Sequence, residues 1–126
     1  VKQKKQVNIV TDQITSPTYV PNLCEMLKEI SAKNINGIIH TSGATSISRY
    51  RMAELIFEKF NLDITLLNKI SSDKMNWIAK RPKNSTLDTS LANSILDKKP
   101  QSIEISLNQF ADEINSNDIN NNYSEN

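Results

Sequence analysis

VNIVTDQITSPTYVPNLCEMLKEISAK, residues 7–33, is typical of one complete strand–loop–helix unit, and this unit decides the fold class. The β-branched run Val7–Thr11 predicts a strand bounded by polar residues. Pro21 suits the first turn of a helix. Apolar residues then recur at helical spacing through about Lys33, namely Leu23, Leu27 and Ile30. Helices this short need a sheet or each other to bury their apolar faces, so the unit predicts a mixed α/β fold.

The middle of the chain continues this alternation of strands and helices. Strands are predicted at Gly37–Thr41 and Ile64–Asn68, where β-branched residues stand between polar or turn residues. Between them, Ser48 is a candidate N-cap for a second helix. Its apolar residues follow at four-residue spacing, namely Met52, Ile56 and Phe60.

Two further helices are predicted near the C-terminal end. Asp88 or Thr89 caps a short helix, and the capping box Ser106–Gln109 precedes another. The expected order is β-α-β-α-β-loop-α-α. We expect residues 1–114 to form one α/β region and the asparagine-rich residues 115–126 to be disordered. Three short strands make a small sheet for an independent domain, so we expect a piece of something larger.

The composition excludes several classes of protein. A net charge of +1 lacks the basic excess of nucleic-acid binders, and no run of about 18 apolar residues is present to span a membrane. We therefore expect neither partner, and a cytoplasmic location. The two glycines, Gly37 and Gly43, exclude a glycine-rich phosphate loop. The single cysteine, Cys24, excludes an internal disulfide, and we expect it to be buried in an apolar helical pattern.

Three polar segments are candidates for binding. Asp12–Pro21 links the first strand to the first helix, Gly37–Tyr50 runs from a strand into a capped helix, and Ala79–Asp88 combines three cations with a proline and two hydroxyls. Each fits a hydrogen-bonded turn as well as a ligand-binding loop at the carboxyl edge of a sheet. Within the last segment, Arg81 offers a planar fork suited to phosphate.

The sequence shows no catalytic or metal-binding pattern. His40 is the only histidine, and we expect a structural role because no zinc-site spacing surrounds it. No nucleophile elbow, Walker loop or Tyr-x-x-x-Lys pair occurs. The residues alone therefore predict a small ligand-binding α/β piece without catalytic machinery.

The three segments, in this order, resemble the C-terminal part of the dTDP-4-dehydrorhamnose reductases. These are extended short-chain dehydrogenase/reductases that act on nucleotide sugars. The resemblance spans Val7 to about Ile114. It is carried by Val10–Gln13 with Ser16–Tyr19, by Gly37–His40 with Ser42, Gly43, Ser48–Tyr50 and Ala53, and by Arg81–Ser85 with Leu87 and Asp88.

The resemblance implies a parent enzyme with two parts. An N-terminal Rossmann half, preceding this chain, would bind NADPH or NADH and carry the catalytic Tyr and Lys, and Val1–Gln6 would be the end of one of its helices. The C-terminal part would close over dTDP-4-dehydro-L-rhamnose, which hydride transfer converts to dTDP-L-rhamnose. A magnesium ion and a homodimer are further possibilities that the resemblance brings, without a ligand set in this sequence.

What the resemblance carries onto this chain is binding. Arg81 is the candidate for the substrate diphosphate, with Asn84 and Ser85 holding it in place. A second group is expected to approach the sugar-nucleotide cleft or shape its wall, namely Gln13, Ser16, Thr18 and Tyr19. Thr15 stands where many relatives have glycine, which should stiffen this loop.

Two other functions remain open from the sequence. One is a non-catalytic regulatory homologue that resembles the β subunit of methionine adenosyltransferase and binds a partner enzyme. The other is a reductase for a different 4-keto sugar nucleotide. The chain alone is expected to be inactive in the leading interpretation, because its function there is to bind the substrate.

Overall fold

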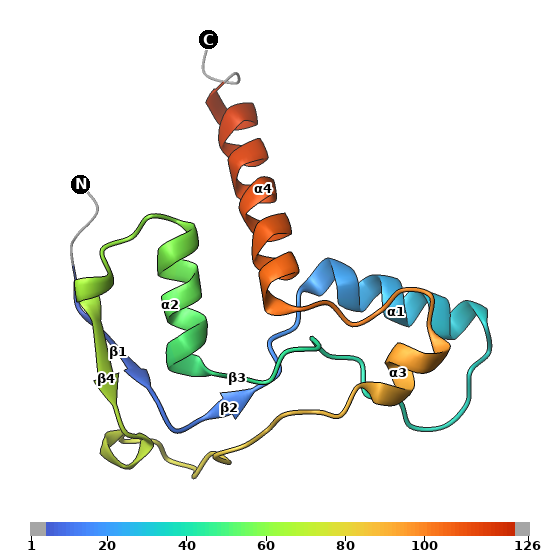
Figure 1. The fold of residues 1–126 in the computed structure, drawn as a ribbon, viewed down its shortest axis with the longest axis horizontal. Coiled ribbons are helices and arrows are strands. Elements are labelled where there is room, and N and C mark those ends of the chain that lie inside the picture. The colour runs from blue at the N-terminus through green and yellow to red at the C-terminus, as the bar shows by residue number, and fades with distance from the viewer. Residues whose placement is uncertain (1–4, 123–126) are drawn as a thin grey trace.

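Strands β1 (Val7–Val10) and β4 (Leu67–Ile70) pair in parallel although they are far apart in the sequence (Figure 1). The structure, a computed structural model, describes residues 5–122 and the side chains of residues 5–116. Helix α2 (Arg49–Lys59) lies between the two strands in the sequence and packs against both. This is the crossover that a parallel pair requires.

A second, antiparallel ladder joins β2 (Ile14–Thr15) to β3 (Ile47–Ser48). The loop around Asn84 adds to β2 on the other side through one bridge to Ile14. The Ile14 amide donates to the Lys83 carbonyl at 2.8 Å, and the Ser85 amide donates to the Ile14 carbonyl at 3.0 Å. These contacts bring together the three polar segments that the sequence keeps apart.

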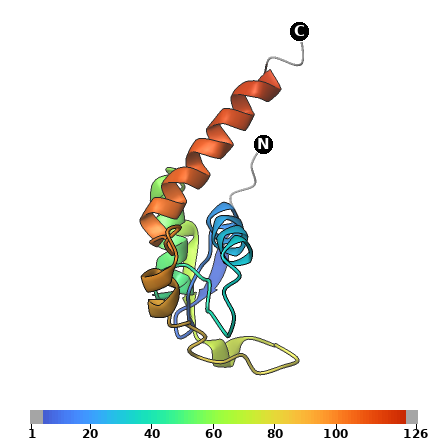
Figure 2. The same ribbon diagram turned by 90° about the vertical axis from the view of Figure 1, so that its right-hand side faces the viewer.

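The helices form two small cores. Helix α1 (Val20–Ala32) and helix α3 (Ser90–Ile95) share a core of Met26, Ala92 and Leu96. Strand β3 and helices α2 and α4 (Ile103–Asn122) share another, built on Ile47, Ile103 and Leu107. Figure 2 shows a thin molecule in which α4 extends beyond the other elements. Burying a large apolar side chain contributes about 1.5–3 kcal/mol, so each core is a modest source of stability.

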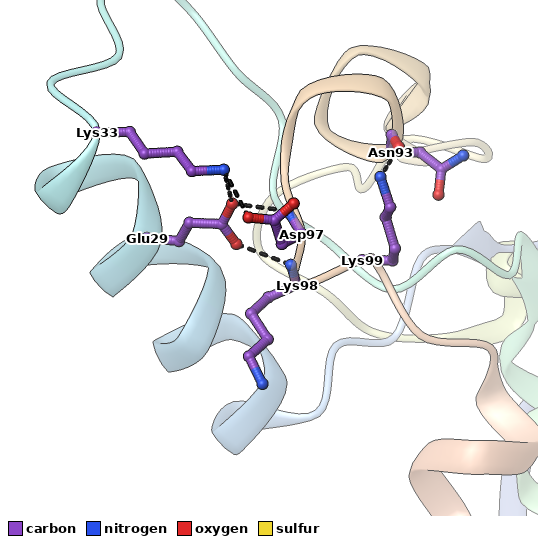
Figure 3. A network of polar contacts seen from close by, with 6 residues as sticks. All are labelled: Glu29, Lys33, Asn93, Asp97, Lys98 and Lys99. Atoms are coloured by element: carbon purple, nitrogen blue, oxygen red, sulfur yellow. Dashed lines mark hydrogen bonds and ion pairs between the residues drawn. The ribbon is translucent and has the colours of Figure 1, made fainter.

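A polar network ties the loop between α3 and α4 to helix α1 (Figure 3). The Glu29 carboxylate accepts hydrogen bonds from Lys33 Nζ at 2.6 Å and from the backbone amides of Asp97 at 2.6 Å and Lys98 at 2.7 Å. These donors lower the pKa of Glu29 to about 2, with Lys33 the largest cause. A carboxylate thus holds the loop on α1 by charge-assisted bonds.

The mixed α/β fold class is confirmed, and several local predictions agree with the structure. The Ser48 hydroxyl accepts from the Arg51 amide at 3.1 Å and caps α2. Asp88 accepts from the Ser90 amide at 2.9 Å, so Asp88 rather than Thr89 supplies the side-chain cap of α3. Within the described range, no helix combines the length and the apolar character needed to cross a membrane.

The predicted strand at Gly37–Thr41 is wrong. Gly37 adopts a φ of +107°, which breaks an extended run, and Ile38 is 86% exposed. The segment pairs with no strand in the described part of the chain, and only Ile39 packs against a core. The strand predicted at Ile64–Asn68 begins later, because Ile64–Leu66 form one 3-10 turn ahead of β4.

The last helix also differs from the prediction. Helix α4 begins at Ile103, one turn ahead of the predicted capping box, and Ser106 is buried inside it. It continues to Asn122 and so includes part of the segment 115–126, for which we expected disorder. Once the first turns are packed, each further residue adds one hydrogen bond without a new nucleation cost. Residues 123–126 lie outside the described range.

The structure also bears on two smaller expectations for the first part of the chain. Cys24 is exposed rather than buried. The buried face of α1 runs through Met26, and a residue two positions away on a helix points to another side. The helix end expected at Val1–Gln6 lies outside the described residues apart from Lys5 and Gln6, which are not helical.

Candidate functional site

A cavity of about 270 Å³ lies where the three polar segments meet. Its walls come from strand β2, the first residue of α2 and the loop at 81–85. Backbone hydrogen bonds fix these pieces to one another, since β2 bonds to the 81–85 loop and the Arg49 amide donates to the Gln13 carbonyl at 3.0 Å. We call this space the cationic cavity, lined by Gln13, Ile14, Thr15, Arg49, Arg81, Pro82 and Ser85.

Gln13 is the buried polar group of the cationic cavity. Its side chain is only 3% exposed, and its Nε2 has no hydrogen-bond partner among the described residues. An amide donor that is buried without a partner costs free energy. Gln13 is a residue of the cavity wall, and a buried donor without a partner calls for an explanation, such as an acceptor from outside the chain.

Arg81 contributes the cation that the sequence singled out. Its guanidinium Cζ lies 5.0 Å from the centroid of the Trp77 ring, a cation–π contact that restrains an exposed side chain. No carboxylate in the described part of the chain pairs with Arg81, in contrast to Lys83, whose Nζ lies 3.9 Å from Asp12 Oδ2. Arg81 therefore keeps its hydrogen-bond fork available for a ligand.

Asp12 anchors the start of this site. Its carboxylate accepts from the Ser72 hydroxyl at 2.6 Å and from the Ser72 amide at 2.9 Å. These bonds are the main reason that the pKa of Asp12 is lowered, and the Lys83 ammonium adds a smaller part. The ionised carboxylate thus joins the end of β1 to the turn after β4.

Arg49 is a site residue that the sequence reasoning missed. It is the first residue of α2, and it lines the cationic cavity together with Gln13 and Arg81. One signal was available in the sequence, because an arginine directly after the N-cap Ser48 places a positive charge at the positive end of a helix dipole. A cation in that position is unfavourable for the helix.

Three of the predicted site residues form hydrogen bonds within or between the loops around the site. The Ser16 hydroxyl accepts from the Leu87 amide at 3.3 Å. The Thr18 hydroxyl donates to the Ser16 carbonyl at 3.2 Å and accepts from the Gly43 amide at 3.1 Å. Asn84 Oδ1 accepts from the amide and the hydroxyl of Thr86 at 3.0 and 2.8 Å. These bonds shape the walls of the site.

Gly43 makes the wall next to Thr18 possible. A Cβ at this position would lie 1.9 Å from the Pro17 carbonyl oxygen. Only glycine permits so close an approach of two backbone segments. The β2–α1 loop therefore lies against the segment that leads into β3.

Tyr19 and Thr18 line a second, mainly apolar cavity of about 520 Å³. The Tyr19 hydroxyl donates to Glu113, and this bond raises the pKa of Tyr19 to about 12. Thr15 and Arg49 line both cavities, so the two spaces adjoin. The apolar wall comes from α2 and α4, with Met52, Ile56, Ile103, Leu107 and Phe110.

The described residues give magnesium no ligand set. A third cavity of about 490 Å³, between α1 and α4, has three carboxylates on its wall, those of Glu25, Asp112 and Glu113. Even so, no group of three or more His, Cys, Asp or Glu among the described residues is placed to hold a metal ion. His40 is exposed and its Nδ1 lies 3.3 Å from the Asp88 carbonyl oxygen.

Fold and site together define a small α/β ligand-binding module. Residues 1–116 match the family described as the RmlD substrate binding domain, and the chain belongs to this family. The chain is 34% identical over 98 residues to dTDP-4-dehydrorhamnose reductase of Aggregatibacter actinomycetemcomitans, covering 69% of this chain and 33% of that protein. It is 32% identical over 91 residues to methionine adenosyltransferase 2 subunit beta of Rattus norvegicus, covering 68% and 27%.

A solved structure supports the same assignment. The crystal structure of dTDP-4-dehydrorhamnose reductase from Bacillus anthracis, in complex with NADP, matches with a TM-score of 0.77 and 30% identity. The match covers 86% of this chain and 38% of that one. The chain spans about a third of the length of the curated relatives it matches. The family resemblance drawn from the three polar segments is thereby confirmed.

Proposed function

We propose that this chain is the nucleotide-sugar binding part of an NAD(P)H-dependent 4-keto reductase that converts dTDP-4-dehydro-L-rhamnose to dTDP-L-rhamnose. The observation that carries the proposal is the cationic cavity, lined by Gln13, whose amide is buried, and by Arg81, which pairs with no carboxylate among the described residues. A diphosphate offers acceptor oxygens to both groups. The chain itself binds and orients, and carries no catalytic residue in this proposal.

The charge of the cavity suits the diphosphate of a sugar nucleotide. A guanidinium forms two parallel hydrogen bonds to phosphate oxygens, and a charge-assisted bond contributes about 1.5–3 kcal/mol. The adjoining apolar cavity, reached past Thr15 and Arg49, gives space for an uncharged part of the same ligand. A module with one cationic and one apolar compartment is suited to a ligand with both characters.

The cofactor and the chemistry belong to another part of the enzyme in this proposal. NADPH or NADH binds to an N-terminal Rossmann half, whose Tyr and Lys handle the proton that accompanies hydride transfer. Large exposed apolar side chains, such as Val20 at 66% and Ile38 at 86%, support a covering unit of this kind. We further propose a cytoplasmic enzyme that forms a homodimer.

The test is the affinity of the chain for dTDP, measured by isothermal titration calorimetry. Arg81→Ala should weaken binding by about 10–100-fold, because one charge-assisted contact is lost. Lys83→Ala is the matched control two residues away, and should bind as the wild type does because Lys83 is directed at Asp12. Unchanged affinity of Arg81→Ala for both dTDP and UDP would contradict the role of Arg81.

An activity assay tests whether this chain only binds the substrate while another part of the enzyme carries out catalysis. The purified chain should not oxidise NADPH in the presence of dTDP-4-dehydro-L-rhamnose. Turnover by the chain alone would show that it contains the catalytic centre. A preference for UDP over dTDP in the calorimetric titration would instead favour a reductase for another 4-keto sugar nucleotide.

A second candidate function is regulatory, and the similarity to methionine adenosyltransferase 2 subunit beta favours it. In that case the chain would bind a methionine adenosyltransferase catalytic subunit. Size-exclusion chromatography of a mixture of the two proteins distinguishes the candidates. Co-elution together with an absence of dTDP binding would favour the regulatory function.

A further inference from the structure

The cationic cavity contains two arginines from different elements, and we propose that Arg49 is the second cation that makes the site select a diphosphate over a monophosphate. This inference rests on the proposed function, because it names a specificity determinant within the same site. Arg49 comes from the start of α2, whereas Arg81 comes from the loop after β4. Both residues line the same cavity.

The backbone around Arg49 fixes it beside Gln13. Its amide donates to the Gln13 carbonyl at 3.0 Å, and the preceding residue Ser48 pairs with Ile14 across the β2–β3 ladder. The residue therefore cannot move away from the cavity without breaking the ladder that builds the wall. Only its long side chain retains freedom, which suits contact with an anion.

A comparison with Arg51 shows what is unusual about Arg49. Arg51, two residues further along α2, pairs with Glu54 at 3.1 Å and Glu58 at 3.5 Å. Arg49 has no such carboxylate among the described residues, and it stands at the helix end where the dipole repels a cation. A guanidinium in that position is stabilised when an anionic ligand enters the cavity.

Gln13 supplies the third contact of the arrangement. Gln13 lines the same cavity as the two arginines, and its buried Nε2 has no hydrogen-bond partner among the described residues. Two cations that share a small space repel each other until a multiply charged anion enters between them. A diphosphate has oxygens for both cations and for the amide, whereas a monophosphate satisfies fewer of these donors.

The experiment compares dTDP with dTMP at one fixed salt concentration. Arg49→Gln should weaken dTDP binding about tenfold, the effect of one lost charge-assisted contact, and dTMP binding by clearly less. The dTDP-to-dTMP selectivity should therefore fall. Arg49→Lys keeps the charge and should recover part of the selectivity. Arg51→Gln is the matched control on the same helix and should bind both nucleotides as the wild type does.

The outcomes separate this inference from the proposed function. Equal losses for dTDP and dTMP, or no loss in Arg49→Gln, overturn the role of Arg49. If Arg81→Ala still loses dTDP affinity in that case, the proposed function stands and only the inference fails. If the wild-type chain does not bind dTDP, both fail together. Circular dichroism of each variant shows whether the helices are intact, and Arg49→Lys provides the reading if Arg49→Gln is misfolded.

Discussion

Gln13 and Asn22 are buried amide side chains from one short stretch of the chain, yet they differ in whether they have hydrogen-bond partners. Gln13 is 3% exposed and Asn22 is 4% exposed. Asn22 Nδ2 donates to the Lys99 carbonyl at 3.0 Å, and its Oδ1 accepts from the Gln101 amide at 3.2 Å. Gln13 Nε2 has no partner in the described part of the chain.

We propose that this difference separates a structural amide, Asn22, from a binding amide, Gln13. Asn22 completes the hydrogen bonds of the Lys99 carbonyl and the Gln101 amide, on either side of the buried Pro100, so its contribution is to stability. Gln13 leaves a donor unused beside two arginines, a state that costs free energy unless something outside the chain accepts the bond. In this proposal, the same residue chemistry at equal burial supports the fold in one region and binds a ligand in the other.

The largest expected effect on stability comes from replacing Asn22, the amide whose hydrogen bonds are formed within the chain. Asn22→Ala leaves the part-buried Lys99 carbonyl and Gln101 amide without their partner, and an unpaired group costs up to about 1–3 kcal/mol when it is buried. We expect the free energy of unfolding to fall by roughly 2–3 kcal/mol in urea titrations, since water replaces part of the loss. Lys28→Ala, at an exposed position of α1, is the control and should unfold as the wild type does. A change below about 0.5 kcal/mol in Asn22→Ala would remove the distinction drawn here.

A smaller effect is expected from Glu29, which holds the same loop from the next turns of α1. Its pKa is lowered from 4.5 to about 2, so the carboxylate contributes stability that is present above the unfolded value and lost as pH falls through the folded value. Unfolding of the wild type should therefore become easier between about pH 4.5 and 2. Glu29→Gln should flatten this dependence, because its amide does not titrate.

The measurement is the thermal midpoint as a function of pH for both proteins. The dependence is reduced rather than abolished, since Asp12, Asp88 and Glu104 also have lowered pKa values. Their pKa values are lowered chiefly by hydrogen bonds to serine or backbone donors. If Glu29→Gln loses stability as steeply as the wild type over this pH range, the Glu29 carboxylate does not hold the loop between α3 and α4 on α1.

The sequence predicted those parts of the fold that local periodicity determines. Val7–Val10, α1 and α2 were identified because their apolar residues repeat at strand or helix spacing and because Ser48 is a strong cap. The β2–β3 ladder was missed, since two-residue strands have no periodicity to detect. Gly37–Thr41 has the composition of a strand, but pairing is a long-range property that composition does not contain.

The candidate site likewise has residues that the sequence predicted and residues that only the structure revealed. Gln13 and Arg81 were singled out from polar loops and from the family resemblance, both of which depend on the order of residues along the chain. Arg49 was missed because its place in the cavity depends on β3 lying beside β2. Ser16 and Thr18 were grouped with the ligand contacts, and only the structure shows that their hydroxyls bond to neighbouring loops.

The smallest expected change in stability comes from substituting Gln13, the amide without a partner. This variant best discriminates a structural amide from a binding amide. Gln13→Met keeps a similar side-chain volume and leaves no hydrogen bond of its Nε2 broken. The free energy of unfolding should therefore change by less than about 1 kcal/mol in either direction. The affinity for dTDP should still fall by about 3–10-fold, because a neutral hydrogen bond contributes roughly 0.5–1.5 kcal/mol.

The two amide variants should thus lose different properties. Gln13→Met should be stable and bind dTDP weakly, whereas Asn22→Ala should be unstable and, at a temperature where it is folded, bind dTDP as the wild type does. Urea titration and calorimetry on the same preparations check both. If Gln13→Met unfolds as easily as Asn22→Ala, then Gln13 supports the fold through contacts of its side chain, and the unpaired donor is no guide to the ligand.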